Sequence, residues 1–137
     1  MFVDTSGLLA LMDGDEPRHE LASAAWMQWI VDGFPLWTTN YVILESTALL
    51  QNRIGMEAVQ NFHRNLVPLL HVKWIDPQLH ADALAIYLAT NQRRLSLVDC
   101  SSFTAMRLLK IDTVFAFDGH FSEQGFRTIP AWEQTGQ

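Results

Sequence analysis

Residues 1–12 read Met-Phe-Val-Asp-Thr-Ser-Gly-Leu-Leu-Ala-Leu-Met, and this stretch decides the fold. Its first four residues are a short apolar run that ends in an aspartate, which predicts a buried strand. Ser6 is then expected to cap a helix that runs to Met12. A buried strand that leads directly into a helix is typical of an α/β fold with a mainly parallel sheet.

The rest of the chain repeats this alternation of short apolar runs and longer amphipathic stretches. We therefore expect a single domain over residues 1–137, with three α/β/α layers and a central, mainly parallel sheet of four or five strands. The expected strands are 1–4, 35–38, 69–75, 113–117 and an edge strand within 125–130. The expected helices are 6–12, a second from a cap at Asp15 to Gly33, a third from a cap at Asn40 to Arg53, 56–66, a fifth that starts at Asp76 and Pro77, and 96–110.

Composition limits the class of protein. Hydrophobic residues make up 49% of the chain and charged residues 18%, which suits a folded domain with a core. The single cysteine, Cys100, excludes an internal disulfide and a cysteine metal site. No apolar run is long enough to span a membrane and no signal peptide precedes the first strand, so we expect a cytoplasmic protein.

The net charge of −6 is unfavourable for a protein that binds nucleic acid, because phosphate contacts usually come from lysine and arginine. The objection weakens if several acids gather around metal. One divalent ion would change −6 to −4, and a second would change it to −2. The remaining basic residues could then still form a local patch.

Three aspartates each have two explanations, one as a structural residue and one as part of a functional site. Asp4 and Asp118 end predicted strands, and Asp99 lies in the first turn of a predicted helix. Alone, Asp4 reads as a helix cap, Asp118-Gly119 as a turn, and Asp99 as the acid of a capping box with Ser96. In open α/β sheets, however, sites gather at the carboxyl ends of strands, so the three side chains could meet there.

Glu45 has no such structural explanation. It lies in the middle of a predicted helix, and its neighbours on the helix face are the apolar residues Val42, Ala48 and Leu49. No lysine or arginine lies within one turn of it. A glutamate on an apolar stripe is expected to be paired, protonated or bound to metal.

A cluster of four carboxylates needs a cation or protons. Two unit charges about 5 Å apart repel by roughly 3 kcal/mol at an effective dielectric of about 20. Six such pairs give repulsion on the order of 10–20 kcal/mol, whereas a domain of this size is stable by only about 5–15 kcal/mol. Oxygen ligands in incomplete coordination favour magnesium or manganese over zinc.

At these residues the sequence resembles the PIN-domain family, and within it the VapC-type toxins of toxin–antitoxin pairs. Residues 2–6, Phe-Val-Asp-Thr-Ser, resemble the first strand of the family with its leading metal aspartate. Residues 44–46, Leu-Glu-Ser, resemble its glutamate helix. Residues 95–103 resemble the third acidic motif, and residues 114–121 resemble the fourth. The resemblance covers nearly the whole chain in order and spacing.

The resemblance implies a magnesium-dependent endoribonuclease, with manganese as a possible substitute, that cuts RNA phosphodiester bonds as the toxin of a type II pair. Asp4, Glu45, Asp99 and Asp118 would bind the metal and act in catalysis, with Thr5 and Ser6 in support. An antitoxin partner and a homodimer are implied as well. The sequence departs from the pattern at Ala116, where many relatives carry a threonine or serine, and this puts the rate of cleavage in doubt.

Further residues have two interpretations each. The adjacent pair Arg93 and Arg94, and His120, could contact RNA, or they could be a solvated helix end and a loop residue. Trp26 and Trp29 lie on the apolar stripe of the second helix, so they belong either to the core or to a surface for a second copy or an antitoxin. In the latter case, a charge at either tryptophan should break association without unfolding the chain.

Two other functions compete with the nuclease. A PIN fold kept as a non-catalytic module that binds RNA or protein is compatible with Ala116 and with the net charge of −6. A phospho-acceptor signalling domain would have a similar length and sheet, but it needs paired acids after the first strand and a lysine after a late strand. Neither feature is present around Asp4 or after Phe117.

Overall fold

The computed structural model describes residues 1–132 and contains a five-stranded sheet in the order β3-β2-β1-β4-β5. Every neighbouring pair of strands is parallel. The strands are β1 (Phe2–Val3), β2 (Trp37–Thr39), β3 (His71–Lys73), β4 (Thr113–Phe115) and β5 (Arg127–Ile129). The helices are α1 (Thr5–Met12), α2 (His19–Asp32), α3 (Asn40–Arg53), α4 (Met56–Asn61), α5 (Pro77–Thr90), α6 (Leu97–Leu109) and α7 (His120–Glu123).

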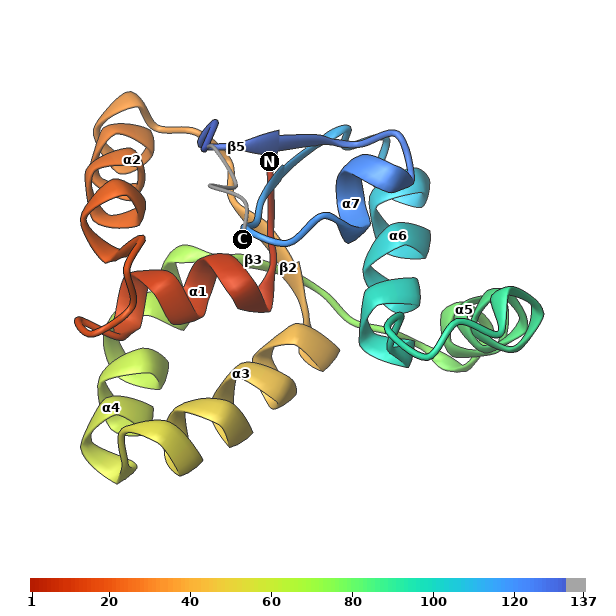
Figure 1. Ribbon diagram of the computed structural model, residues 1–137, viewed down its shortest axis with the longest axis horizontal. Helices are drawn as coiled ribbons and strands as arrows, with labels where there is room; N and C mark the ends of the chain where they lie inside the picture. The colour runs from red at the N-terminus through yellow and green to blue at the C-terminus, as the bar shows by residue number, and fades with distance from the viewer. Residues whose placement is uncertain (133–137) are drawn as a thin grey trace.

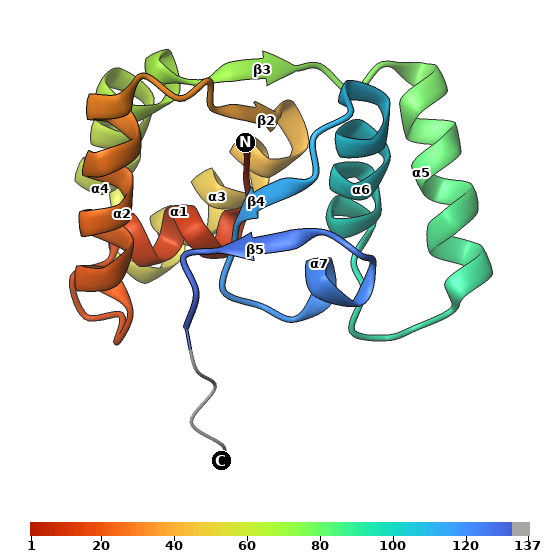
Figure 2. The same cartoon turned by 90° about the horizontal axis from the view of Figure 1, so that it is seen from above.

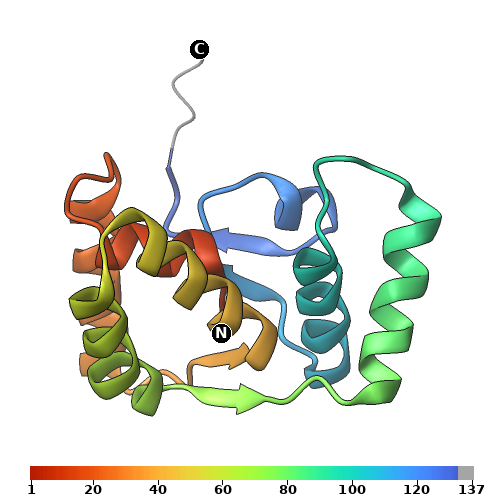
Figure 3. The same ribbon diagram turned by 90° about the horizontal axis from the view of Figure 1, so that it is seen from below.

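The sheet lies between two groups of helices, which confirms the expected three-layer α/β/α fold. Helices α1, α2 and α4 gather on one side of the strands, and α6 and α5 lie on the other (Figures 1 and 2). The view from below shows α5 at the far end of the molecule, beyond α6 (Figure 3). In the described part of the chain, no helix is both long and apolar enough to cross a membrane.

The five expected strands are all present, but several helix ends differ from the prediction. Asp4, and not Ser6, caps α1, because its carboxylate accepts the backbone N–H of Ser6. Helix α2 begins at His19, four residues after the expected cap at Asp15. Thr39 caps α3 in place of Asn40, whose side-chain oxygen instead accepts the N–H of Ile75.

Two segments depart further from the expected pattern. The predicted helix 56–66 ends as an α-helix at Asn61 and continues as a π-helical turn (Phe62–Leu66) and a 3₁₀ turn (Val67–Leu69). The short helix α7 was not predicted, because four residues after an Asp-Gly turn carry too little periodicity to be recognised. This helix begins at His120, one of the candidate residues singled out in the sequence.

The two tryptophans of α2 belong to the core side of the helix. Trp26 is only 6% exposed, and its ring lies 5.9 Å from that of Phe115. Trp29 packs edge-on against the same ring at 5.0 Å. The core interpretation is therefore right for Trp26, where a charge would enter the core, whereas Trp29 is only partly buried. The exposed apolar side chains of α2 are Leu21, Met27, Ile30 and Val31, and Met27 and Val31 are the most exposed of them.

One glycine sets how closely α1 approaches the sheet. A Cβ atom at Gly7 would lie 2.6 Å from the backbone oxygen of Phe115 and 2.8 Å from its ring. Real Cβ atoms do not come this close to backbone, so only glycine permits the contact. The first turn of α1 therefore lies directly against the end of β4, and this brings Asp4 close to the segment that carries Asp118.

Candidate metal centre at the carboxyl edge of the sheet

The four predicted acids come from four different elements that end or begin at one edge of the sheet. Asp4 follows β1, and Asp118 follows β4 by three residues. Asp99 lies in the first turn of α6, and Glu45 lies in the second turn of α3. In Figure 1 the starts of α1, α3 and α6 approach one another below the strands. The acids influence one another electrostatically, as their pKa values show.

Asp4 is the most deeply buried member of the group, at 3% exposure. Burial and the negative charges of Asp118 and Asp99 raise its pKa to about 7, against the hydrogen bonds from Ser6, which lower it. These bonds come from the Ser6 backbone at 3.1 Å and from its hydroxyl at 2.7 Å, both to Oδ2. The Ser6 hydroxyl also accepts the N–H of Phe117 at 3.0 Å, so it joins the ends of β1 and β4.

Glu45 reaches the same edge from α3 and is half-buried. Burial raises its pKa, and the charges of Asp99 and Asp118 raise it further, while a hydrogen bond from the Thr5 side chain lowers it. Among the described residues, Glu45 forms no salt bridge. We expected Glu45 to have a partner from elsewhere in the fold. Its neighbours there are the hydrogen-bond donor Thr5 and the charged groups of Asp99 and Asp118.

Asp99 and Asp118 are held by local backbone contacts. Asp99 forms the capping box of α6, because Ser96 accepts its N–H and its Oδ2 accepts the N–H of Ser96, both at 3.0 Å. Oδ1 of Asp118 accepts the N–H of His120 at 3.0 Å. Burial and the charge of Asp99 raise the pKa of Asp118, while the hydrogen bond and charge of His120 lower it. Asp99 thus has its expected role in the capping box and Asp118 its expected role in the turn, and both also lie at the candidate site.

The donor set fits a hard divalent cation. Burial and mutual repulsion disfavour the charged form of three carboxylates that lie together, and a cation would relieve both penalties. One oxygen of Asp99, one oxygen of Asp118 and one ring nitrogen of His120 all lie within 4.8 Å of one another. Carboxylate oxygens in such a group are the ligands that magnesium and manganese prefer.

The other residues singled out in the sequence lie around this edge to different degrees. Arg94 forms an ion pair with Glu123 of α7, in which its Nη2 atom donates to both carboxylate oxygens, at 3.0 and 3.2 Å. Arg93 is exposed beside it, and both line an open hollow of about 700 Å³. Ala116 is fully buried and packs in the core, so no hydroxyl stands at this position of the segment that leads to Asp118.

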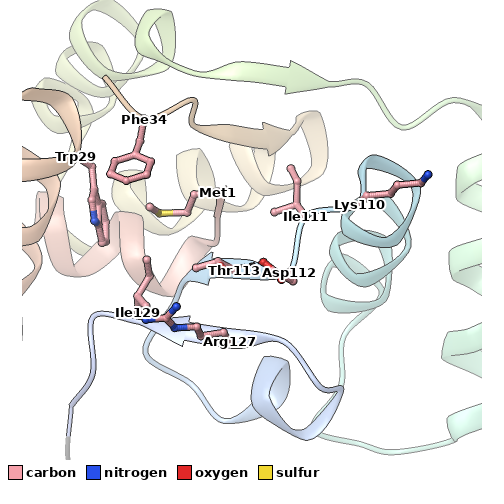
Figure 4. Close-up of a pocket in the computed structure, with 9 residues that line it drawn as sticks. All are labelled: Met1, Trp29, Phe34, Lys110, Ile111, Asp112, Thr113, Arg127 and Ile129. Carbon is pink, nitrogen blue, oxygen red and sulfur yellow. Dashed lines mark hydrogen bonds between the residues drawn. The ribbon is translucent and has the colours of Figure 1, made fainter. Parts of the chain in front are cut away.

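A second cavity, of about 440 Å³, lies at the opposite, amino edge of the sheet. Figure 4 shows Trp29, Phe34 and Met1 around one part of it, with Asp112 and Arg127 at another and the Lys110 side chain directed away. None of the four predicted acids lines this cavity. It is therefore separate from the candidate metal centre.

A five-stranded parallel sheet of this order, with acids at its carboxyl edge, defines a PIN-like protein. The chain belongs to the PIN-domain family, whose profile matches residues 1–127. It is homologous to the VapC-type toxins within that family. The 23S rRNA-specific endonuclease VapC20 of Mycobacterium tuberculosis is 33% identical over 127 residues, which cover 92% of this chain and 95% of the relative.

Solved structures agree with this placement. The crystal structure of VapC20 from Mycobacterium tuberculosis, described as a toxin that cleaves the sarcin–ricin loop, matches with a TM-score of 0.80 at 32% identity, over 91% of this chain and 95% of that one. FitAcB from Neisseria gonorrhoeae matches with a TM-score of 0.69 at 13% identity, over 94% and 96% of the two chains. FitAB bound to a DNA fragment matches at 0.70 and 16% identity, over 98% and 99%. The last two show the fold alone, whereas VapC20 confirms the predicted family and nuclease class.

Proposed function

We propose that this protein is a magnesium-dependent endoribonuclease that hydrolyses RNA phosphodiester bonds as the toxin of a type II toxin–antitoxin pair. The observation that carries the proposal is the buried carboxylate of Asp4, whose pKa is raised by burial and by the charges of Asp118 and Asp99. A bare group of this kind opposes folding at neutral pH, so its presence is best explained by a bound cation. The homology to VapC20 supports RNA as the substrate.

Each acid has a defined task in this proposal. Asp4, Asp99 and Glu45 would hold the cation, and Asp118 would hold it directly or orient the attacking water. When bound, the divalent ion supplies positive charge opposite the phosphate and makes water more acidic. The 2.7 Å hydrogen bond from Ser6 favours the ionised form of Asp4 and holds its side chain in place, and the hydrogen bond from Thr5 favours the ionised form of Glu45.

The RNA would approach over the side that carries α7. Arg94 is tied to Glu123 of α7, and the same helix begins with His120 at the acid site. This arrangement connects the exposed Arg93 and Arg94 to the metal centre by one short helix. We infer that Arg93 contacts a phosphate near the cleavage point, which compensates locally for the net charge of −6.

Partners and setting follow from the same proposal. A toxin of this kind is paired with an antitoxin and acts on cytoplasmic RNA, and we propose that it forms a homodimer from single-domain chains. The exposed apolar residues Met27 and Val31 of α2 are candidates for a contact with either partner. Size-exclusion chromatography with light scattering, on the protein alone and with its neighbouring gene product, tests both associations.

The alternative is a PIN fold that binds RNA or protein without turnover, which the buried Ala116 and the negative net charge favour. Purified protein should be incubated with labelled rRNA, tRNA and mRNA, with magnesium or with chelator. We expect cleavage only with metal, and none in Glu45→Gln, which keeps the shape of the side chain. Glu57→Gln, an exposed change on α4, is the matched control. Binding without cleavage in every condition would establish the non-catalytic module.

A further inference from the structure

His120 sits at the metal centre, closer to two of the acids than the sequence suggested. It is the first residue of α7 and follows the Asp118-Gly119 turn. Its Nδ1 atom lies 3.2 Å from Oδ2 of Asp99 and 3.9 Å from Oδ1 of Asp118. The imidazole therefore lies beside two carboxylates that belong to different elements of the fold.

The Nδ1 atom is buried, yet no described residue accepts or donates a hydrogen bond at it. Asp99 is near enough for an ion pair, but the ring N–H is not aligned with its carboxylate oxygen. Buried polar atoms in folded proteins nearly always have a partner, and an ion or a water is the usual explanation where the protein offers none. The free nitrogen therefore points to a ligand between His120 and the aspartates.

The spacing of the three side chains suits one cation. Ligand atoms about 2.1 Å from an octahedral ion lie roughly 3 Å apart in adjacent positions and roughly 4 Å apart in opposite ones. The nitrogen–oxygen distances of 3.2 and 3.9 Å fall in this range, and all three ligand atoms lie within 4.8 Å of one another. Little movement would be needed to close them around an ion.

We propose that Nδ1 of His120 is a ligand of the same cation as Asp99 and Asp118, so that this chain has a mixed nitrogen–oxygen centre that prefers manganese to magnesium. The inference rests on the metal centre of the proposed function, and it adds the imidazole and the preference. Magnesium is a hard ion that binds almost entirely through oxygen, whereas transition metals accept imidazole readily. One nitrogen ligand is therefore enough to separate the two ions.

The competing explanation is a protonated His120 that forms ion pairs with Asp99 and Asp118. The two explanations predict opposite effects of His120→Gln on metal binding. If the imidazole is a ligand, the variant binds manganese more weakly, because a ligand is lost. If the imidazole is a cation, the variant binds metal more tightly, because a positive charge has left the site.

The test uses the full chain without RNA. Pulsed electron paramagnetic resonance of the manganese-loaded wild-type protein should show coupling to one histidine nitrogen, and this coupling should disappear in His120→Gln. Calorimetry should show the Kd for manganese rising about tenfold or more in the variant, with the Kd for magnesium changing by much less. His63→Gln, whose exposed ring bonds to Thr47, is the matched control and should behave as wild type.

Several results would overturn the inference: no nitrogen coupling in the wild type, coupling that persists in His120→Gln, or a variant that binds manganese as tightly as the wild type or more so. Circular dichroism checks that the variant is folded. If the variant does not fold, the paramagnetic resonance spectrum of the wild-type protein still shows whether a histidine nitrogen binds the manganese. Cleavage of RNA is scored separately. Nitrogen coupling without any cleavage would support the ligand role while refuting the nuclease, and cleavage without coupling would do the reverse.

Discussion

The hydroxyl of Ser6 donates a 2.7 Å hydrogen bond to Oδ2 of Asp4, and the same hydroxyl accepts the backbone N–H of Phe117. One small side chain thereby stabilises the ionised form of the most buried acid and joins two strands at the site. The hydrogen bond lowers the pKa of Asp4, while burial and the neighbouring acids raise it. Removing the hydroxyl should therefore affect both metal binding and folding.

For Ser6→Ala, we expect weaker magnesium binding at pH 7 and a loss of about 1–3 kcal/mol in the free energy of unfolding, because the N–H of Phe117 is left without its partner. Calorimetry and urea unfolding measure the two effects. Ser23→Ala on α2 is the control, since its hydroxyl has only a 3.5 Å contact with His19. Unchanged magnesium affinity in Ser6→Ala would show that the hydroxyl does not support the metal centre.

The metal-free protein should lose stability as pH rises. Burial raises the pKa of Asp4 from 3.8 to about 7, so between these values the folded chain holds a proton that the unfolded chain has released. The stabilisation is complete below pH 4 and is lost as pH approaches 7, by about 4 kcal/mol. The raised pKa values of Glu45 and Asp118 act in the same direction.

Urea unfolding at pH 5 and pH 8, each with and without magnesium, measures this effect. Magnesium should stabilise the protein much more at pH 8, and Asp4→Asn should flatten the pH profile of the metal-free form. A metal-free protein that becomes more stable between pH 5 and pH 8 would contradict the burial of Asp4 as an unpaired carboxyl.

Glu45→Gln should separate folding from activity. The substitution removes one negative charge from the acid cluster, so the metal-free variant should be at least as stable as the wild type at pH 8. RNA cleavage should fall below detection, because the variant lacks one of the carboxylates that would hold the cation. A thermal shift assay and a cleavage assay give the two readings. Lower stability together with full cleavage would place Glu45 outside the site.

Gly7→Ala should destabilise the fold by about 1–3 kcal/mol, because the new Cβ would meet the backbone oxygen of Phe115 at 2.6 Å and α1 must move away. Gly14→Ala is a matched control, since nothing lies within 4 Å of a Cβ at that position. Thermal unfolding of both variants decides the point. Equal melting temperatures for the two variants would mean that α1 and β4 are not in close contact.

Trp26→Ala and Met27→Ala should behave differently although the residues are adjacent. Trp26 is in the core and its loss should cost about 3–5 kcal/mol of stability, whereas Met27 is 61% exposed and its loss should leave the melting temperature nearly unchanged. If Met27 contacts a partner, its substitution should instead weaken association in light scattering. A stable, folded Trp26→Ala would count against the described core.

Much of the architecture could be predicted because its signals are local. The central strands β1 and β4 lie in short apolar runs, and the capping box of Ser96 and Asp99 and the left-handed Gly33 at the end of α2 are visible as sequence patterns. The choice of Thr39 over Asn40 as a cap was not visible. It depends on Ile75, which is 35 residues away and takes the Asn40 side chain as its own hydrogen-bond partner.

The candidate site, like the fold, could be predicted where its signals are local and could not be predicted where it depends on contacts between distant residues. The acids were predicted from their places at strand ends and helix starts, and from a glutamate on an apolar stripe. Their mutual effects on pKa arise only when β1, β4, α3 and α6 are assembled. His120 was a candidate from its place two residues after Asp118, but its approach to Asp99 could not be predicted, because it depends on α7.

Two of the acids also hold the ends of helices. Asp4 caps α1 and Asp99 completes the capping box of α6, whereas Glu45 lies inside α3 and has no such duty. Alanine at Asp4 or Asp99 would loosen a helix while it disables the centre, so loss of toxicity in such a variant would not distinguish misfolding from lost chemistry. Glutamine at Glu45 is thus the cleanest way to make an intact but harmless protein for crystallising a complex with uncut RNA.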